Sequence, residues 1–269
     1  MANDKLIIDV KNLVKKFDKF TAVDDITFNV KAGETFAFLG PNGAGKSTTI
    51  KMLTTLLTPT SGDIMINDQD PNKNQGKVRK SFGIVFQDPS LDDDLTAQEN
   101  MELHAALYSV DPKIRKSRID ELLSFVDLAD KKKWMVKTFS GGMKRRLEIA
   151  RGLLHHPKIL FLDEPTIGLD PQTRNSMWTY LKNVTKKEGM TVFFTTHYMD
   201  EAEKNADRVV IIDHGKIIAH GTPEELKTKT NTKNLEDAFL NLTGHEIRNE
   251  EAGAIDRLRQ RRGAWAGRR

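Results

Sequence analysis

The sequence contains no cysteine, few aromatic residues and no long apolar run. Without cysteine the chain can form neither a disulfide framework nor a thiolate metal site. Its longest apolar segments, such as Val209–Ile212 and Thr191–Phe194, are far too short to span a bilayer. The first residues carry an early acidic side chain and no extended apolar region, so we expect no signal peptide. These absences predict a soluble protein of a reducing, intracellular compartment.

Basic charge is concentrated at one end of the chain. The formal net charge is +4, yet between residues 252 and 269 six arginines stand against one aspartate. The rest of the chain is therefore close to neutral and lacks the overall basic excess of a protein that binds a nucleic-acid backbone, so we expect no specific nucleic-acid partner. The Arg-rich end is expected to be a disordered tail, with docking on anionic lipid or RNA as the alternative.

The length of 269 residues suggests one or two domains, and 38% hydrophobic with 30% charged residues is ordinary globular composition. Short apolar runs alternate with longer amphipathic stretches. Strands are predicted over residues 6–10, 26–30, 35–39, 82–86, 158–162, 191–195 and 209–213. Helices are expected to begin after Gly45, near Thr96, near Lys113, near Gly141 and after Pro171. This alternation predicts an α/β fold with a largely parallel sheet.

Helical signals dominate between Asp88 and His156, which predicts a helical insert there. Thr96 followed by Glu99 forms a capping box, the signature of a helix start. After Lys229 the pattern thins, although Leu235–Leu242 can form two helical turns with an apolar face.

The strongest motif is a glycine-rich segment that follows the apolar strand 35–39 and precedes a helical stretch. It fits the pattern G-x-x-x-x-G-K-[ST] and consists of Gly40, Pro41, Asn42, Gly43, Ala44, Gly45, Lys46, Ser47 and Thr48. Glycines let backbone N–H groups and the following helix N-terminus face phosphates. Lys46 would neutralise the β- and γ-phosphates, and the Ser47 hydroxyl would bind Mg²⁺. The segment predicts a nucleotide site.

Two carboxylates follow the apolar strand 159–162. They are Asp163 and Glu164, before Pro165. Open α/β sheets hold ligands at the carboxyl ends of their strands. Asp163 would therefore help to hold Mg²⁺, and Glu164 would polarise the attacking water as a general base. Acidic residues also commonly begin turns, so this pair alone is a weak indication of a catalytic site. Together with the phosphate loop it becomes a strong one.

A second anion cradle is predicted where Ser140, Gly141 and Gly142 open an amphipathic helix. The serine hydroxyl, the bare N–H groups and the positive end of the helix all favour an anion. An ordinary helix cap is the alternative for this turn alone. Because the chain already has its own phosphate loop, the second cradle suggests that it faces a nucleotide on another chain.

Together these motifs resemble the ATP-binding subunit of ABC transporters, from about Leu6 to Lys229. The resemblance implies a P-loop NTPase of the ABC type: a RecA-like, mostly parallel core, an N-terminal antiparallel β subdomain and a helical signature subdomain. It implies an ATP-binding domain over residues 1–229, with the helical part at about 88–156, and a C-terminal extension over 230–269. It also implies ATP and Mg²⁺ as ligands and a second copy of the chain as partner in an ATP-sandwich dimer.

Four further residues take their expected roles from this resemblance. Phe17 would stack on adenine, and Gln87 would sense Mg²⁺ and the water and couple to the membrane partner. Asp170, in Gly-Leu-Asp-Pro, would lie in the loop that crosses the dimer seam, and His197 would reach the γ-phosphate. The alternatives are a core position for Phe17, a polar loop position for Gln87, a helix cap for Asp170 and a strand end for His197.

Two residues depart from the family pattern. Met143 stands where many members have Gln, and Phe17 where many have Tyr, which keeps the stacking face but loses the hydroxyl. Glu164 and His197, whose loss marks a degenerate site, are both present.

Within the family, the chain is most similar to the daunorubicin-type drug-resistance exporters. This resemblance rests on residues 139–171 and on the segment LEDAFLNLTGHEIRNEE. It implies an ATP-hydrolysing motor bound to a separate type-2 membrane permease, on the cytoplasmic face of the membrane. A soluble ABC ATPase that acts on ribosomes or DNA, and a regulator that binds nucleotide without turnover, remain as alternatives. The transported substrate does not follow, because the permease selects it.

Overall fold

The computed structural model describes residues 5–244 and contains two sheets. The smaller is antiparallel, with strand order β2-β1-β4, and comprises β1 (Leu6–Phe17), β2 (Phe20–Lys31) and β4 (Ser61–Ile66). The larger has the order β5-β6-β7-β3-β8-β9. Its strands are β3 (Thr35–Leu39), β5 (Phe82–Val85), β6 (Ile159–Asp163), β7 (Thr191–Thr196), β8 (Arg208–Asp213) and β9 (Lys216–Gly221). All its pairs are parallel except β8 with β9.

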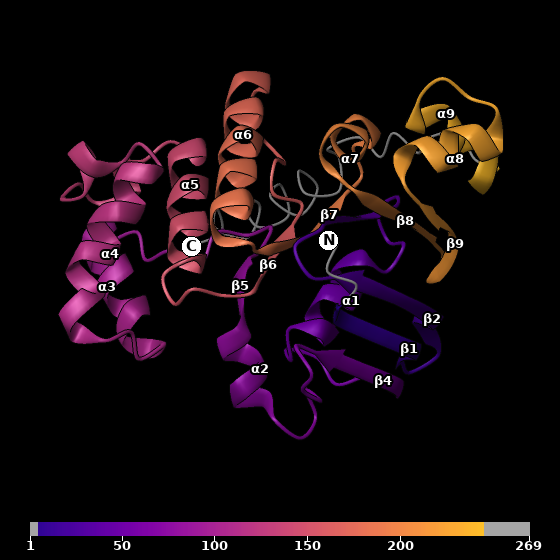
Figure 1. The fold of residues 1–269 in the computed structure, drawn as a ribbon, viewed down its shortest axis with the longest axis horizontal. Coiled ribbons are helices and arrows are strands. Elements are labelled where there is room, and N and C mark those ends of the chain that lie inside the picture. The colour runs from indigo at the N-terminus through magenta and orange to yellow at the C-terminus, as the bar shows by residue number, and fades with distance from the viewer. Residues whose placement is uncertain (1–4, 245–269) are drawn as a thin grey trace, which may run out of the picture.

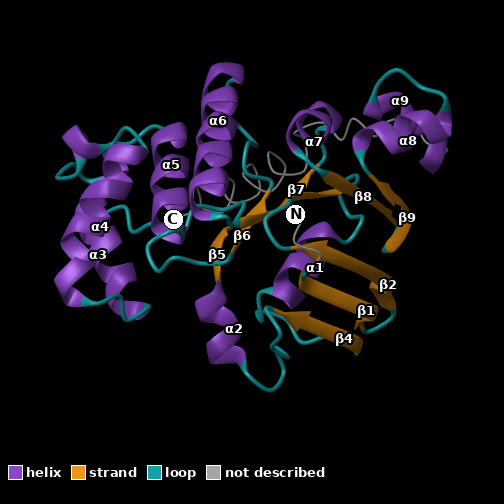
Figure 2. Cartoon of the chain, in the orientation of Figure 1, coloured by secondary structure: helices purple, strands orange, loops and turns teal. Residues whose placement is uncertain are grey.

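Helices cover the larger sheet and extend from one end of it (Figures 1 and 2). Between β5 and β6 lie α3 (Ala97–Leu107), α4 (Pro112–Phe125), α5 (Gly141–Gly152) and the short 3₁₀ turns Ala129–Lys131 and Val136–Thr138. The other helices are α1 (Lys46–Leu53), α2 (Gln75–Ser81), α6 (Pro171–Glu188), α7 (Met199–Asn205), α8 (Pro223–Thr230) and α9 (Leu235–Thr243). None of the helices in residues 5–244 has both the length and the apolar character needed to cross a bilayer.

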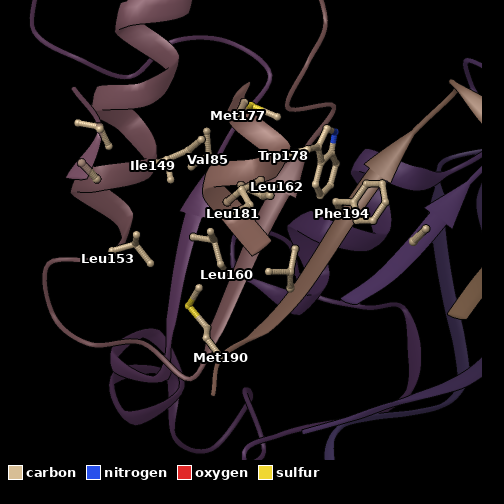
Figure 3. Packing of buried hydrophobic residues seen from close by; sticks show 14 of the residues in the cluster. Val85, Ile149, Leu153, Leu160, Leu162, Met177, Trp178, Leu181, Met190 and Phe194 are labelled. Carbon is tan, nitrogen blue, oxygen red and sulfur yellow. The ribbon is translucent and has the colours of Figure 1, made fainter. Parts of the chain in front are cut away.

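The central strands are buried on both faces, as their nearly continuous apolar sequences predict. Alternate residues enter two different cores. Leu160, Leu162 and Phe194 point toward α5 and α6, where Figure 3 shows them beside Trp178 and Leu181. Phe161 and Phe193 point to the opposite side, toward the small sheet, where Phe193 lies 5.4–6.2 Å from four other phenylalanine rings. The larger sheet is therefore the common wall of both cores.

The predicted α/β fold is confirmed, and each predicted strand is present, β3 with its predicted bounds and the others with at least one end shifted. The first two strands are much longer than predicted because they form one hairpin. Sequence patterns missed β4, β9, α2, α7 and α8. The segment 235–242 lies in α9, which buries Leu235 and Phe239 in the same core as α5 and α6. The expected Arg-rich tail lies outside the described residues.

Candidate functional site

The phosphate loop connects the buried strand β3 to α1 and requires glycine at specific points. Gly43 and Gly45 have positive φ angles of 81° and 109°, which L side chains rarely adopt. A Cβ atom on Gly40 would lie 2.2 Å from the carbonyl oxygen of Ile212, so this position is also too close to β8 for a side chain. Gly45 caps α1 and has no side chain to accept from the first amides of the helix. These N–H groups can therefore face an anion.

The side chain of Lys46 is only 4% exposed and packs against the backbone of this loop. Its Nζ donates to the carbonyl oxygens of Gly40 at 2.8 Å and Pro41 at 3.1 Å. It also forms an ion pair with Oε1 of Glu164 at 3.2 Å. Burial lowers the pKa of Lys46, and the Glu164 carboxylate opposes that shift. The ammonium group is thus bound to the backbone of the loop and lies next to the Glu164 carboxylate.

Asp163 ends β6 and contacts two hydroxyl groups. Its Oδ1 accepts from Ser47 at 3.2 Å and from Thr195 of the neighbouring strand β7 at 2.6 Å. Asp163 and Ser47 therefore meet as the sequence predicted, since parallel strands end at the same edge of the sheet. A hydroxyl and a carboxylate oxygen are ligands that suit Mg²⁺.

Glu164 follows directly and has an unusual backbone, with φ at +46°. Its N–H donates to Thr195 Oγ1 at 3.0 Å, and its Oε2 lies 3.0 Å from Nδ1 of His197. Burial by itself raises the pKa of Glu164, but the His197 hydrogen bond and the Lys46 charge lower it overall. The carboxylate is therefore ionised at neutral pH, as a general base requires.

The structure thus brings together the phosphate loop, Asp163, Glu164 and His197. Thr195 joins two of them, and sequence reasoning missed it because a threonine inside an apolar strand carries no signal of its own. Arg145 was missed as well. It lies within the basic run Lys144–Arg146, which predicts solvent exposure, yet its side chain is buried and contacts the backbone of Asp163 and Glu164.

Other predicted site residues lie on the surface. Phe17 is 44% exposed near the β1–β2 turn, with Lys15 Nζ 5.0 Å from its ring centre, so the alternative of a core phenylalanine is wrong. Gln87 is exposed just after β5. Within residues 5–244, no hydrogen bond or ion pair joins Phe17, Gln87, Ser140 or Asp170 to the phosphate loop.

Ser140 and Asp170 are both helix caps, on helices whose first turns approach each other. Ser140 accepts from the Met143 N–H at 3.3 Å, and Asp170 accepts from the Thr173 N–H at 3.0 Å. A Cβ atom on Gly142 would lie 2.8 Å from Thr173 Cγ2, so glycine allows this approach. Ser140 and Asp170 are both exposed, and the helices that they cap approach each other at their first turns.

Comparison with known proteins identifies the family. The family model described as ABC transporter matches residues 23–167. The linearmycin resistance ATP-binding protein of Bacillus subtilis (strain 168) is 43% identical over 220 residues, which cover 82% of this chain and 70% of the relative. The daunorubicin/doxorubicin resistance ATP-binding protein of Streptomyces peucetius is 43% identical over 221 residues, which cover 82% and 67%.

The fold and the chemistry of a solved protein agree with this match. The dimeric structure of an ATP-binding cassette in a post-hydrolysis state, bound to ADP and Pi, is similar with a TM-score of 0.72 and 29% identity. The similarity covers 80% of this chain and 98% of that one. That solved protein is a dimer, and cbiO1 of Clostridium perfringens, similar with a TM-score of 0.77 and 32% identity, is part of an ABC transporter complex. The chain belongs to the ABC transporter family as a subunit that binds and hydrolyses ATP.

Proposed function

We propose that this ATPase is the motor subunit of an exporter and that Glu164 is its general base. The observation that carries the catalytic assignment is the convergence of Lys46, Glu164 and His197 within hydrogen-bonding distance. Lys46 would bind the β- and γ-phosphates, Glu164 would accept a proton from the attacking water, and His197 would hold the Glu164 carboxylate and reach the γ-phosphate. Backbone N–H groups of the phosphate loop would bind the remaining phosphate oxygens.

The Lys46–Glu164 ion pair makes the basicity of Glu164 depend on whether a phosphate is bound beside Lys46. A phosphate beside Lys46 would share the positive charge that now helps to lower the pKa of Glu164. The pKa of that carboxyl would then rise, and a carboxylate of higher pKa is a stronger base. Glu164 would thus accept a proton more readily when a γ-phosphate is bound.

The residues around Asp163 fit Mg²⁺. Ser47 and Asp163 would hold the ion through the hydroxyl and carboxylate oxygens that now lie 3.2 Å apart, and Gln87 would approach from the neighbouring strand end. When bound, the ion would neutralise charge on the β- and γ-phosphate oxygens. The Thr195 hydroxyl would keep the Asp163 carboxylate oriented.

Two copies would share each nucleotide. The cap formed by Ser140, Gly141 and Gly142 offers an exposed hydroxyl and the unpaired N–H groups of a helix start. Within the part of the chain that the structure describes, it forms no hydrogen bond with the phosphate loop of its own chain. In a head-to-tail dimer with C₂ symmetry, this cap would bind the γ-phosphate held by the partner's loop. Asp170 would lie at the seam, because its helix packs beside the cap.

The exporter assignment is supported by the two drug-resistance relatives at 43% identity. We propose a separate permease of the type-2 exporter class as partner, which would place the chain on the cytoplasmic face of the membrane. Co-expression with a membrane protein found in a neighbouring reading frame tests the assignment. We expect a nuclease-resistant complex with substrate-stimulated ATPase activity, whereas nuclease-sensitive association with ribosomes or DNA would favour the soluble alternative.

Mixing two inactive variants tests the shared site. Lys46→Ala removes the phosphate-binding cation, and Ser140→Arg blocks the cap, so each homodimer has two defective sites. A mixed dimer contains one site made of an intact loop and an intact cap. We expect turnover to reappear on mixing. Absence of recovery, together with a Glu164→Gln protein that stays monomeric with ATP by light scattering at tens of micromolar, would contradict the sandwich.

A further inference from the structure

Arg145 is a buried cation whose guanidinium contacts the ends of two strands. It lies in the second turn of α5 and is 6% exposed. Its Nε donates to the carbonyl oxygen of Pro165 at 2.8 Å. Its Nη2 donates to the carbonyl oxygens of Asp163 at 3.2 Å and Glu164 at 3.1 Å. One side chain from α5 therefore donates to three successive carbonyl oxygens, those of the proposed base and its two chain neighbours.

The second terminal nitrogen of the same side chain points to the segment that carries Gln87. Nη1 of Arg145 donates to the carbonyl oxygen of Phe86, the residue before Gln87, and pairs with Oε2 of Glu148 at 3.2 Å. The other oxygen of Glu148 accepts from the N–H of Ser90 at 2.7 Å. Lys144 adds an ion pair to Asp93 at 2.6 Å. The start of α5 and the segment 86–93 are thus bound to each other, with Arg145 at their junction.

These contacts act on a backbone that needs support. At φ +46° Glu164 occupies the left-handed region, which is unfavourable for a residue with a Cβ atom. Hydrogen bonds hold it from both sides: Thr195 Oγ1 accepts from its N–H, and Arg145 donates to its carbonyl oxygen. The direction of the Glu164 side chain depends on this backbone conformation, because the Cα–Cβ bond turns with φ.

We propose that Arg145 is a positioning residue, which holds the backbone of Glu164 so that its carboxylate faces the attacking water. This inference rests on the proposed role of Glu164. Because Ser140 caps α5, a movement of this helix would also change the direction of the Glu164 carboxylate. The change would pass through the contact between Arg145 and the Glu164 carbonyl oxygen. Engagement of the cap by the partner's nucleotide would thereby be sensed at Glu164 of the same chain.

The first test replaces Arg145 by lysine, which keeps the charge but loses the planar fork that binds several carbonyls at once. We expect kcat to fall about tenfold or more, while the Kd for ATP stays within about threefold, because Arg145 does not touch the phosphate loop. Arg146→Lys is the matched control. Arg146 lies on the same helix, but it donates to the Val126 carbonyl oxygen at 2.9 Å and pairs with Asp127, both in the helical insert. Its kcat should remain near the wild-type value.

A double-mutant cycle separates positioning from mere structural support. If Arg145 acts through the Glu164 carboxylate, Arg145→Lys should cause almost no further loss of residual turnover in a Glu164→Gln background. The same fold-loss in both backgrounds, or a wild-type kcat for Arg145→Lys, would overturn the proposal. Wild-type turnover by Glu164→Gln alone would instead refute the proposed base. Arg145→Gln enters the same cycle if the lysine variant melts below the assay temperature.

Discussion

The Nδ1 atom of His197 lies 3.0 Å from Oε2 of Glu164, and the two residues follow the adjacent parallel strands β7 and β6. Strand pairing alone brings the two side chains to one edge of the sheet. The hydrogen bond contributes to the lowered pKa of Glu164, so the acid is ionised where a proton must be accepted. Glu164 would accept the proton, and His197 would hold the Glu164 carboxylate. Variants of Glu164 and Lys46 can therefore separate the loss of proton transfer from the loss of phosphate binding.

Glu164→Gln should retain ATP binding and lose turnover by roughly 10²- to 10⁴-fold, the usual contribution of a general base. Glutamine has nearly the same shape but accepts no proton at neutral pH. Single-turnover hydrolysis measures the chemical step, and titration with a fluorescent ATP analogue measures binding. Lys46→Ala should differ by weakening binding itself, because the phosphates lose their counter-charge. More than about a tenth of wild-type turnover in Glu164→Gln would assign the base elsewhere.

Phe17→Ala should weaken ATP binding by about 1–3 kcal/mol, the usual value of base–aromatic stacking, whereas Phe17→Tyr should bind about as well as the wild type. The exposed ring is free to stack on adenine. Phe20→Ala is the control, since Phe20 is 63% exposed in the same hairpin and starts the next strand. Calorimetric titration with ATP measures all three. Equal affinity of the two alanine variants would place the adenine away from Phe17.

The sequence predicted the parts of this site that local patterns determine. A glycine-rich turn between an apolar strand and a helix can be recognised as a phosphate loop. The acids Asp163 and Glu164 stand at the carboxyl end of an apolar strand, which is where open α/β sheets hold ligands. Because the ends of parallel strands meet at one edge, the meeting of Ser47 with Asp163 followed from these patterns.

Contacts made by unremarkable residues could not be predicted in this way. In the sequence, Thr195 is a polar residue in a buried strand and gives no sign of its contacts. Arg145 lies in a basic run, which predicts exposure. Its burial depends on carbonyl groups that the tertiary fold brings close, and a local pattern cannot show these. The edge strands β4 and β9 were missed for a related reason. They are six residues long and only partly buried, so their hydrophobic signal is weak.

Gly40→Ala should destabilise the protein by about 1–3 kcal/mol, the range for overpacking, and should also weaken ATP binding. The new Cβ would lie 2.2 Å from the Ile212 carbonyl oxygen, so β3 and β8 would have to separate beside the phosphate loop. Thermal unfolding with and without ATP measures both effects. Gly76→Ala on α2 is the control: it meets no atom within 4 Å and should be neutral or slightly stabilising. Equal midpoints for the two variants would refute the steric argument.

His104 should make the protein less stable as the pH falls below neutrality. Its ring lies 4.6 Å from Tyr108 and 6.3 Å from His155. Burial, followed by the nearby Arg151 charge, lowers the pKa of His104 to about 3. The unfolded chain therefore binds a proton that the folded chain does not, from the ordinary histidine pKa of about 6.5 downward. The stabilisation is complete above that pH and is lost progressively toward pH 3.

The expected loss from this residue between pH 7 and pH 5 is about 1–2 kcal/mol, since the unfolded state alone is protonated in that range. Urea unfolding of the wild type and of His104→Gln at both pH values measures it. The variant should be less stable at pH 7 but should lose less stability on acidification. His220→Gln on the exposed edge of β9 is the control and should follow the wild type. A wild-type pH dependence in His104→Gln would mean that other groups bind the proton, with the half-buried His155 as the first to examine.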